Sequence, residues 1–572
     1  MKPLKSIYWL ALTAALALAA CSKEDPAPTP EPNPEPEPEQ TEIVIEQTEY
    51  TLDADEERTA TVAFTATADW TLSVAYDDAE SSADWLTVTP TSGTAGEQTV
   101  ELSAARNFRA SARTAYADIA CGKQSVRLTV TQTAASDATD FTAQFDPDFA
   151  KELQKQGIIA DAGNITPEDM EKIAAITELD VSGTEDAPGA LTSLQGIEYF
   201  ESLTDLECEY NRLTSLDVSA NTKLWLLSCS NNSLKTLNVS ANSELITLHC
   251  EENQLTELDV STNTKLSYLY GNDNQLTSLD ISANSELTYL YCYDNQLSSL
   301  DVSANPELII IWGSNNSLTE LDVSANTKLT HLYCERNLLT ELDVSRNTEL
   351  TDLICFNNQL TELDVRANTK LSDLSCSNNK LTELDVRANT ELVTFDCSDN
   401  SLTELDVSAN TKLAWYFYCN GNQLTELDVS NCTALEELYC HDNQLTSLDV
   451  SNCTALEELY CHDNQLTSLD VSRNTALTNL VCYSNQLTEL DVSQNTMLTS
   501  LRCHYNQLAT LDVSRNTALT QLYCSYNPGD GVSSFPITAW FDNDTKPDNL
   551  EIDREQWTYD GKSITIDFRK AE

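Results

Sequence analysis

Hydrophobic positions repeat with a period of 21 residues from Leu203 to Asn527, which is more than half of the chain. One unit has the sequence Leu245-x-x-Leu248-x-Cys250-x-x-Asn253-x-Leu255-x-x-Leu258-Asp259-Val260-Ser261-x-Asn263, and about sixteen such units follow one another, with a single inserted residue near Tyr416. A unit this short cannot bury its apolar side alone. The pattern therefore predicts a stacked solenoid with a continuous hydrophobic core.

The strand of each unit can be placed from the alternation around its cysteine. Leu248 and Cys250 lie two residues apart, so both side chains point inward and the residue between them points outward. Fourteen units have cysteine at this inward position, whereas Gly271 and Gly313 occupy it in two others. A buried thiol behaves as a small hydrophobic group, so we predict that these cysteines fill the core.

Three of these cysteines precede a histidine, in the pairs Cys440-His441, Cys461-His462 and Cys503-His504. Adjacent strand residues face opposite sides, so the thiol and the imidazole of one pair cannot share an ion, and we predict no metal site. Cys432 and Cys453 differ, because they replace the final asparagine of two neighbouring units. Since neighbouring coils stack at about strand spacing, this pair could form a disulfide or remain two free thiols.

Two polar positions repeat together with the leucines. The asparagine equivalent to Asn253 has an amide that both donates and accepts, so it can satisfy backbone groups where the chain leaves the strand. The aspartate equivalent to Asp259 lies on the outside of each coil, where stacked like charges repel. Hydrogen bonds from local backbone donors would offset this repulsion, and bound Ca²⁺ is the alternative that the sequence leaves open.

Aromatic residues concentrate at the outward positions of the predicted strands. Such a row is longer than scattered surface rings would give, and it predicts a recognition surface on the outward face of the sheet. The alternative is that neighbouring rings only stabilise the sheet face. The residues predicted to bind a ligand are Tyr268, Tyr270, Tyr289, Tyr291, Tyr293, Trp312, Tyr333, Phe356, Tyr418, Tyr439 and Tyr460.

The N-terminus has the pattern of a targeting segment. Two lysines precede an apolar run from Ile7 to Ala20, which is too short for an ordinary membrane span. We therefore predict a signal peptide over residues 1–20. Residues 21–40 follow as a linker with proline at alternate positions, a sequence that favours an extended polyproline II spacer.

Two short regions flank the repeats. In residues 140–202, Asp146-Pro147 and Thr166-Pro167 each combine a capping side chain with proline at the first helical position. We predict that this region forms a helical N-terminal cap and a first irregular repeat. Residues 528–572 alternate on both sides of Asp560-Gly561 and predict a closing β-hairpin.

Composition and charge limit the partners. The chain has a formal net charge of -59 and an isoelectric point near 4.1. Such a surface repels nucleic acid and anionic lipid, and it favours basic partners or divalent cations. The sequence contains no Gly-x-Ser-x-Gly elbow, no His-Glu-x-x-His motif and no phosphate-binding glycine loop, so we expect neither an enzyme nor a cofactor.

Residues 41–134 contain short strand-like runs separated by Gly, Pro, Asp and Ser, which predict a small β-sandwich. Within them, Trp85–Gly93 and the closing Leu128–Gln132 resemble a BACON domain, an immunoglobulin-like module of surface lipoproteins and glycan-degrading enzymes. The resemblance implies either carbohydrate binding or a spacer role. We expect Trp70 and Trp85 in the core, because a sandwich this small needs buried aromatic side chains.

The repeat resembles the bacterial leucine-rich repeat family, in a form where the third leucine of the strand is cysteine. This resemblance implies a curved leucine-rich repeat solenoid with a parallel sheet on its concave side and a mostly irregular convex side. Leu18-Ala19-Ala20-Cys21 resembles the lipobox of bacterial lipoproteins, which implies that Cys21 is lipidated. The protein would then be an outer-membrane lipoprotein, exposed on the surface of a Gram-negative cell and attached to the membrane through its lipid only.

Together these observations predict a non-catalytic cell-surface binding protein, an adhesin or a scaffold. It would recognise a protein or a glycan through the concave aromatic face, because rings can stack on sugars or anchor a protein loop. Two alternatives remain. The first is an acidic repeat that captures a basic protein or divalent cations, and the second is a purely structural surface spacer.

Overall fold

The computed structural model describes residues 42–55, 58–76, 85–135 and 140–571. They form two compact units, one ending at Ala135 and one that comprises the rest of the chain together with Phe108–Ala110. The predicted signal peptide, the lipidation site at Cys21 and the linker of residues 21–40 lie outside the described residues. None of the helices in the described parts has the length and apolarity to span a bilayer.

The first unit is a β-sandwich of two sheets. Its four-stranded sheet has the order β1-β3-β7-β5 and its five-stranded sheet the order β2-β9-β8-β4-β6. Trp70 and Trp85 are 1% and 3% exposed, which confirms that both belong to the core. The strands are β1 (Ile43–Ile45), β2 (Glu49–Leu52), β3 (Thr59–Ala66), β4 (Trp70–Tyr76), β5 (Leu86–Thr89), β6 (Ser92–Gly93), β7 (Gly96–Ala104), β8 (Arg113–Cys121) and β9 (Gln124–Gln132).

The second unit begins with a helical cap formed by η1 (Thr142–Gln144), α1 (Pro147–Lys155), α2 (Pro167–Ala175) and η2 (Ile197–Tyr199). The Asp146 side chain accepts hydrogen bonds from the first turn of α1. Thr166 and Asp169 form a capping box at the start of α2, which satisfies otherwise unpaired amide groups. The sequence correctly predicts both helix starts, because each cap is a local signal.

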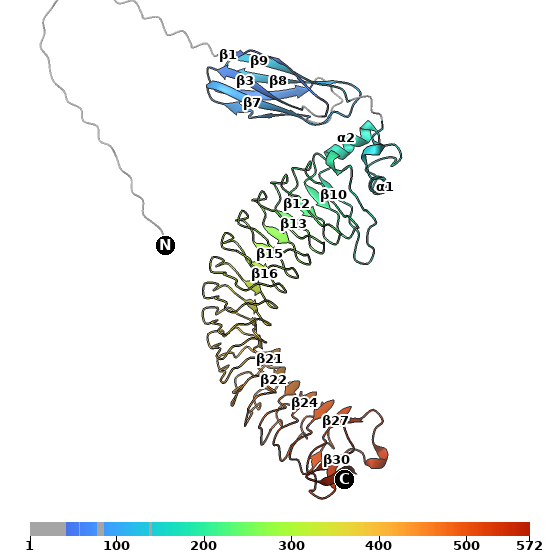
Figure 1. Cartoon of the computed structure of the whole chain (residues 1–572), viewed down its shortest axis with the longest axis vertical. Coiled ribbons are helices and arrows are strands. Elements are labelled where there is room, and N and C mark those ends of the chain that lie inside the picture. The colour runs from blue at the N-terminus through green and yellow to red at the C-terminus, as the bar shows by residue number, and fades with distance from the viewer. Residues whose placement is uncertain (1–41, 56–57, 77–84, 136–139, 572) are drawn as a thin grey trace, which may run out of the picture. The chain divides into compact units, whose positions relative to one another are not determined.

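The repeats form a single parallel sheet of 18 strands. In Figure 1 these strands lie along the inner edge of the curved solenoid and the irregular segments along its outer edge. The strands are β10 (Glu178–Asp180), β11 (Asp205–Glu207), β12 (Leu226–Ser228), β13 (Thr247–His249), β14 (Tyr268–Tyr270), β15 (Tyr289–Tyr291), β16 (Ile310–Trp312), β17 (His331–Tyr333), β18 (Asp352–Ile354), β19 (Asp373–Ser375), β20 (Thr394–Asp396), β21 (Tyr416–Tyr418), β22 (Glu437–Tyr439), β23 (Glu458–Tyr460), β24 (Asn479–Val481), β25 (Ser500–Arg502), β27 (Gln521–Tyr523) and β29 (Glu551–Ile552).

Inward-facing side chains fill the solenoid core as the alternation predicts. Leu248 and Cys250 are fully buried, and the Cys250 thiol donates to the carbonyl of Tyr270 in the next coil at 3.3 Å. The Asn253 amide donates to the carbonyls of Cys229 and Cys250 and accepts from the backbone N–H of Leu234. Each coil is therefore tied to its neighbour by side-chain hydrogen bonds as well as by the sheet.

The inserted residue of the sequence pattern is accommodated in the coil that contains β21. Phe395 and Phe417 replace leucine in this part of the core and stack with ring centroids 5.4 Å apart. Trp415 lies at the insertion and is 63% exposed. The strand register is restored beyond this point, where Tyr418 pairs with Tyr439.

The C-terminal end of the solenoid is closed by a four-stranded sheet in the order β26-β28-β31-β30, with η3 (Asn543–Thr545) between its strands. The hairpin that the sequence predicts is present as β30 (Gln556–Tyr559) and β31 (Lys562–Lys570), which turn at Asp560-Gly561. The sequence does not predict β26 (Leu511–Asp512) and β28 (Ser534–Ala539). Pro536 argues against a strand within β28, because proline has no N–H to donate to a sheet.

Candidate binding site on the concave face

The eleven aromatic residues predicted to bind a ligand all lie outside the hydrophobic core. Tyr268 is exposed and the other ten are half-buried. Parallel pairing in register places equivalent residues of neighbouring coils side by side. Each ring therefore covers part of its neighbour. The rings therefore contact one another in columns that run along the solenoid.

The first column runs from β13 to β17. His249 and Tyr270 stack with ring centroids 4.2 Å apart, and Tyr270 and Tyr291 follow at 4.7 Å. Trp312 continues the column, 5.7 Å from Tyr291 and 5.0 Å from Tyr333. We call these five residues the first stack. They form one continuous aromatic surface across five coils.

Three other predicted residues lie beside the first stack. Tyr268 and Tyr289 form a parallel pair at 4.9 Å, and Tyr293 lies 4.8 Å from Trp312. Phe356 lies further along, with the Arg336 guanidinium 5.9 Å from its ring centroid.

The second column consists of Tyr418, Tyr439 and Tyr460, which we call the second stack. Successive ring centroids lie 4.3 Å apart. Here two of the three hydroxyl groups are already engaged, because Tyr418 donates to Glu437 at 2.5 Å and Tyr439 donates to Glu458 at 2.8 Å. Burial and the hydrogen bond to Glu458 raise the pKa of Tyr439, so its phenol is neutral over the ordinary pH range.

A hollow of about 320 Å³ opens next to the first stack. Carboxylates and rings share its lining, which the sequence pattern does not reveal because the glutamates come from two units. Glu209 and Glu251 directly follow a core cysteine, as Tyr293 does, and Glu252 follows Glu251. The lining consists of Glu209, Tyr210, Ser230, Asn231, Glu251, Glu252, Tyr270, Asn272, Tyr291, Tyr293 and Trp312.

Negative charge is concentrated around this hollow. One oxygen of Glu251 lies 3.3 Å from Nδ1 of His249, whereas its other oxygen is buried and has no hydrogen-bond partner among the described residues. Burial and the neighbouring Asp273 and Glu251 raise the pKa of Glu252. Burial also raises the pKa of Tyr333 to about 12, so this ring is uncharged. The arrangement favours a positively charged group at the hollow.

A larger hollow of about 940 Å³ lies along the Leu-Asp-Val segments between Glu362 and Asp449. Its arginines are already paired, Arg366 with Asp364 at 2.7 Å and Arg387 with Asp385 at 2.8 Å. Among the residues that the structure describes, no aromatic residue lines this larger hollow, and none of its carboxylates has a buried oxygen without a partner, as Glu251 has beside the smaller hollow.

The aspartates of these segments accept hydrogen bonds from local backbone donors. Asp259 Oδ1 accepts from the N–H of Ser261 at 2.9 Å, and Asp280 accepts in the same way from Ser282 at 3.0 Å. Hydrogen bonds from Ser261 lower the pKa of Asp259. These bonds stabilise the stacked charges without an ion, whereas Ca²⁺ binding stays a hypothesis.

Cys432 and Cys453 are both buried as free thiols. The Cys453 sulfur makes a weak contact with the carbonyl of Val429 at 3.5 Å. In the other coils the equivalent asparagine, such as Asn474, donates two short hydrogen bonds to the preceding coil. The two cysteines therefore interrupt this asparagine ladder.

The first unit matches a family model described as the Viral BACON domain over residues 42–135. No curated protein matches the chain. Among solved structures, the chain is similar to the functional domain of InlJ from Listeria monocytogenes, which includes a cysteine ladder. The identity is 32%, the TM-score is 0.58, and the match covers 75% of this chain and 98% of that domain.

Two further solved structures share the fold. An internalin, InlF, from Listeria monocytogenes has 22% identity and a TM-score of 0.50, and the match covers 57% of this chain and 98% of that one. The leucine-rich repeat ectodomain of the plant membrane receptor kinase GASSHO1/SCHENGEN3 from Arabidopsis thaliana has 23% identity and a TM-score of 0.54, with coverage of 64% and 51%. That ectodomain is in complex with CASPARIAN STRIP INTEGRITY FACTOR 2.

The second unit is thus a parallel solenoid with the repeat length and fold of leucine-rich repeat proteins. Because the chain is 32% identical to the InlJ domain and the match covers 98% of that domain, the chain belongs to the leucine-rich repeat family. Its first unit matches the BACON domain, as its sequence predicts.

Proposed function

We propose that this protein is a non-catalytic surface protein that binds a protein partner on the concave face of its repeats, at the first stack. The observation that carries the proposal is the hollow beside Trp312, where rings and carboxylates meet. A partner that inserts an arginine or a lysine there would place its cation over aromatic faces and against Glu251. The concave sheet of a solenoid suits such an extended contact.

Charge favours a basic protein over a neutral glycan at this site. One buried oxygen of Glu251 has no hydrogen-bond partner among the described residues, and burial together with repulsion from nearby carboxylates raises the pKa of Glu252. A cationic side chain would relieve both. The net charge of -59 would also speed the approach of a basic partner. The carboxylates beside the second stack already have donors, because Glu437 accepts from Tyr418 and Glu458 accepts from Tyr439.

The test uses random peptides displayed on phage and selected on the folded repeat protein. We expect the selected peptides to be enriched in arginine or lysine. The double variant Glu251→Gln/Glu252→Gln should bind them at least about tenfold more weakly, since it removes charge without removing a ring. Added salt should weaken binding to the wild type as well.

The matched control is Glu437→Gln/Glu458→Gln, which removes two carboxylates from the second stack. Binding to this variant should stay within about twofold of the wild type, which is a difference of only a few tenths of a kcal/mol. Equal losses in the two variants would mean that net charge alone drives binding. Peptide binding that neither variant changes would contradict a protein-binding pocket. Binding to a glycan array that Glu251→Gln/Glu252→Gln abolishes would contradict it as well.

We also propose that residues 1–40 place the repeats at the cell surface. A lipid on Cys21 would hold the protein at the outer membrane, and the alternate prolines of the linker would keep the folded units away from the bilayer. Labelling cells with an alkyne fatty acid should mark the wild type and leave Cys21→Ala unmarked. Equal labelling of the two would contradict lipidation at this cysteine.

A further inference from the structure

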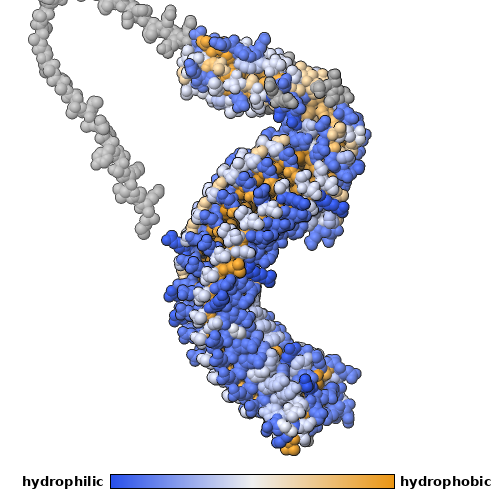
Figure 2. All heavy atoms as spheres, in the orientation of Figure 1, coloured by the Kyte–Doolittle hydropathy of each residue, from blue (hydrophilic) through white to orange (hydrophobic). Residues whose placement is uncertain are grey.

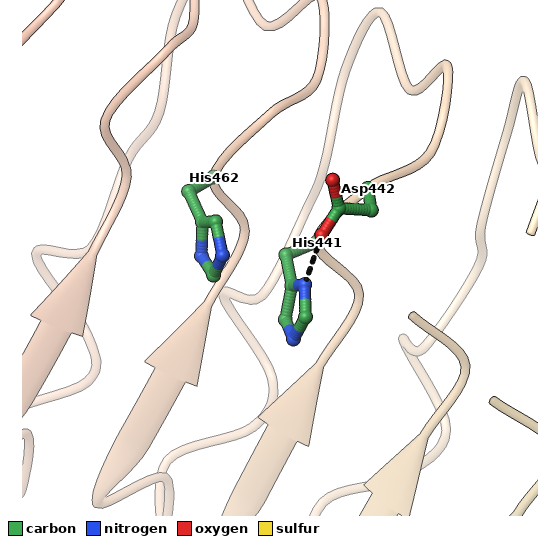
Figure 3. Close-up of side chains that lie close together, drawn as sticks. All are labelled: His441, Asp442 and His462. Carbon is green, nitrogen blue, oxygen red and sulfur yellow. Dashed lines mark hydrogen bonds and ion pairs between the residues drawn. The ribbon is translucent and has the colours of Figure 1, made fainter. Parts of the chain in front are cut away.

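Two histidines and an aspartate meet on the concave face just beyond the second stack. His441 follows β22 and His462 follows β23, and their rings stack with centroids 4.1 Å apart and planes 12° from parallel. Oδ2 of Asp442 lies 2.8 Å from Nδ1 of His441. Figure 3 shows both imidazoles projecting from neighbouring coils, with Asp442 beside His441. One possible ligand atom from each of the three residues lies within 4.8 Å of the others.

The repeat places the two histidines next to each other. Leu427–Ser447 and Leu448–Ser468 are identical in sequence. Parallel pairing of Tyr439 with Tyr460 sets each unit beside its copy, so the histidine of one unit lies against the histidine of the next. Duplication of one unit thus turned a single His-Asp pair into a cluster from two coils. Alternation within one strand separates each thiol from the imidazole that follows it, but this contact joins two coils and depends on their stacking.

His462 lacks the hydrogen bond that a buried imidazole normally makes. It is 8% exposed and lies between His441 and Tyr483, whose ring centroid is 4.3 Å away. Its Nδ1 is buried and has no hydrogen-bond partner among the described residues. A buried polar nitrogen without a partner costs about 1–3 kcal/mol. An ion bound to this nitrogen would satisfy it.

We propose that His441, Asp442 and His462 bind one divalent transition-metal ion of the Zn²⁺ class. Two imidazoles and one carboxylate are ligands that Zn²⁺ prefers, whereas Ca²⁺ and Mg²⁺ prefer sites made of oxygen alone. Three protein ligands leave a fourth position for water or for a group from a partner. The ligand atoms must move closer than they are now, and the half-exposed position of His441 and the exposed position of Asp442 allow their side chains to turn.

Neighbouring thiols do not compete for an ion at this site, because Cys440 and Cys461 are fully buried in the core. The surrounding charge is acidic, since the carboxylate of Asp399 lies close enough to interact with His441. His504 and Arg502 also lie close enough to interact with His462, and the positive charge of Arg502 opposes binding of a cation.

The test is titration of the folded protein with Zn²⁺ by calorimetry, in a large excess of Mg²⁺ that occupies weak carboxylate sites. We expect one tight site per chain. Replacing Zn²⁺ by Co²⁺ should give visible absorption bands of a site with nitrogen ligands. His441→Gln and His462→Gln should each weaken Zn²⁺ binding at least about tenfold. Asp442→Asn should also weaken it, by no more than the histidine variants do.

The duplicated unit supplies matched controls. Asp463 is the copy of Asp442 but lies next to Tyr483, outside the cluster. His504 is a half-buried imidazole that also stacks on Tyr483, at 4.4 Å, and has an unpartnered Nδ1. Asp463→Asn and His504→Gln should bind Zn²⁺ as the wild type does.

Three outcomes would overturn the proposal. The first is the lack of a tight Zn²⁺ site in the presence of Mg²⁺. The second is Zn²⁺ binding that neither Asp442→Asn nor His441→Gln weakens. The third is an equal loss of Zn²⁺ affinity in Asp463→Asn and Asp442→Asn. Thermal unfolding without metal shows whether each variant is folded. Because Asp442 is exposed, its variant remains informative if His462→Gln fails to fold.

Discussion

Replacing Tyr291 by alanine removes a ring from the middle of the first stack, and the structure sets the size of the effect. Tyr291 contacts Tyr270 at 4.7 Å with planes 19° apart, and Trp312 at 5.7 Å with planes 46° apart. Each aromatic pair contributes about 0.5–1.5 kcal/mol beyond the burial of its area. We therefore expect the variant to lose about 1–3 kcal/mol of unfolding free energy from ring contacts alone.

A double-mutant cycle isolates this ring contact from other effects of the substitution. The free energy of unfolding is measured in urea for Tyr270→Ala, Tyr291→Ala and the double variant. The coupling energy should be about 0.5–1.5 kcal/mol, because the two rings touch. The matched control is the cycle of Tyr270 with Tyr333, which lies three coils further along.

Tyr270 and Tyr333 do not belong to adjacent coils, so their coupling should lie within about 0.3–0.5 kcal/mol of zero. A coupling between Tyr270 and Tyr291 as small as that of this control would contradict a contact between the two rings. The rings would then be surface groups without mutual contact in solution. In either case the peptide-binding test at Glu251 and Glu252 stays separate, because it leaves the rings in place.

Three further predictions concern single positions. A Cβ added at Gly271 would find its nearest heavy atoms at 3.9 Å, so Gly271→Ala should raise stability by about 0.4–1 kcal/mol in thermal unfolding, and a lower stability would refute this. Asn253→Ala leaves the buried Leu234 N–H without its acceptor and should cost about 2–4 kcal/mol in urea, whereas a loss equal to that of the exposed Gln254→Ala would contradict the ladder's role. The pKa of His462 falls to about 4 on folding, so the stability from its neutral form is complete above pH 6.5 and is lost as the pH falls towards 4. Relative to His462→Gln, the wild type should lose at most about 3 kcal/mol over that pH range, and a constant difference would be evidence against this burial.

The repeat determines most of the fold directly from the sequence. Alternation around Leu248 and Cys250 correctly predicts which side chains enter the core. The caps at Asp146 and Thr166 are equally predictable, because their signals lie within a few residues. The closing sheet is predicted only in part, since β26 and β28 pair with strands distant in sequence and β28 contains Pro536.

The candidate site is less predictable, because it depends on contacts between coils. The sequence places the eleven aromatic residues on the outward face, which agrees with the structure. It does not show that Glu251 and Glu252 surround the same hollow as Trp312. The acidic residues of this chain are numerous, so only their position in space separates these two from the others. In Figure 2 hydrophilic residues cover most of the visible solenoid surface, so a polar residue by itself does not mark the hollow.

Hydroxyl-radical footprinting with mass spectrometry, in the presence of peptides selected on the wild-type protein, shows whether the first stack and its acidic hollow form the docking surface. Bound peptide should protect Tyr291 and Trp312, while Trp415, at 63% exposure on a different coil, should react as in the free protein. Protection confined to the second stack or to residues outside the concave face, with Trp312 still reactive, would contradict the account.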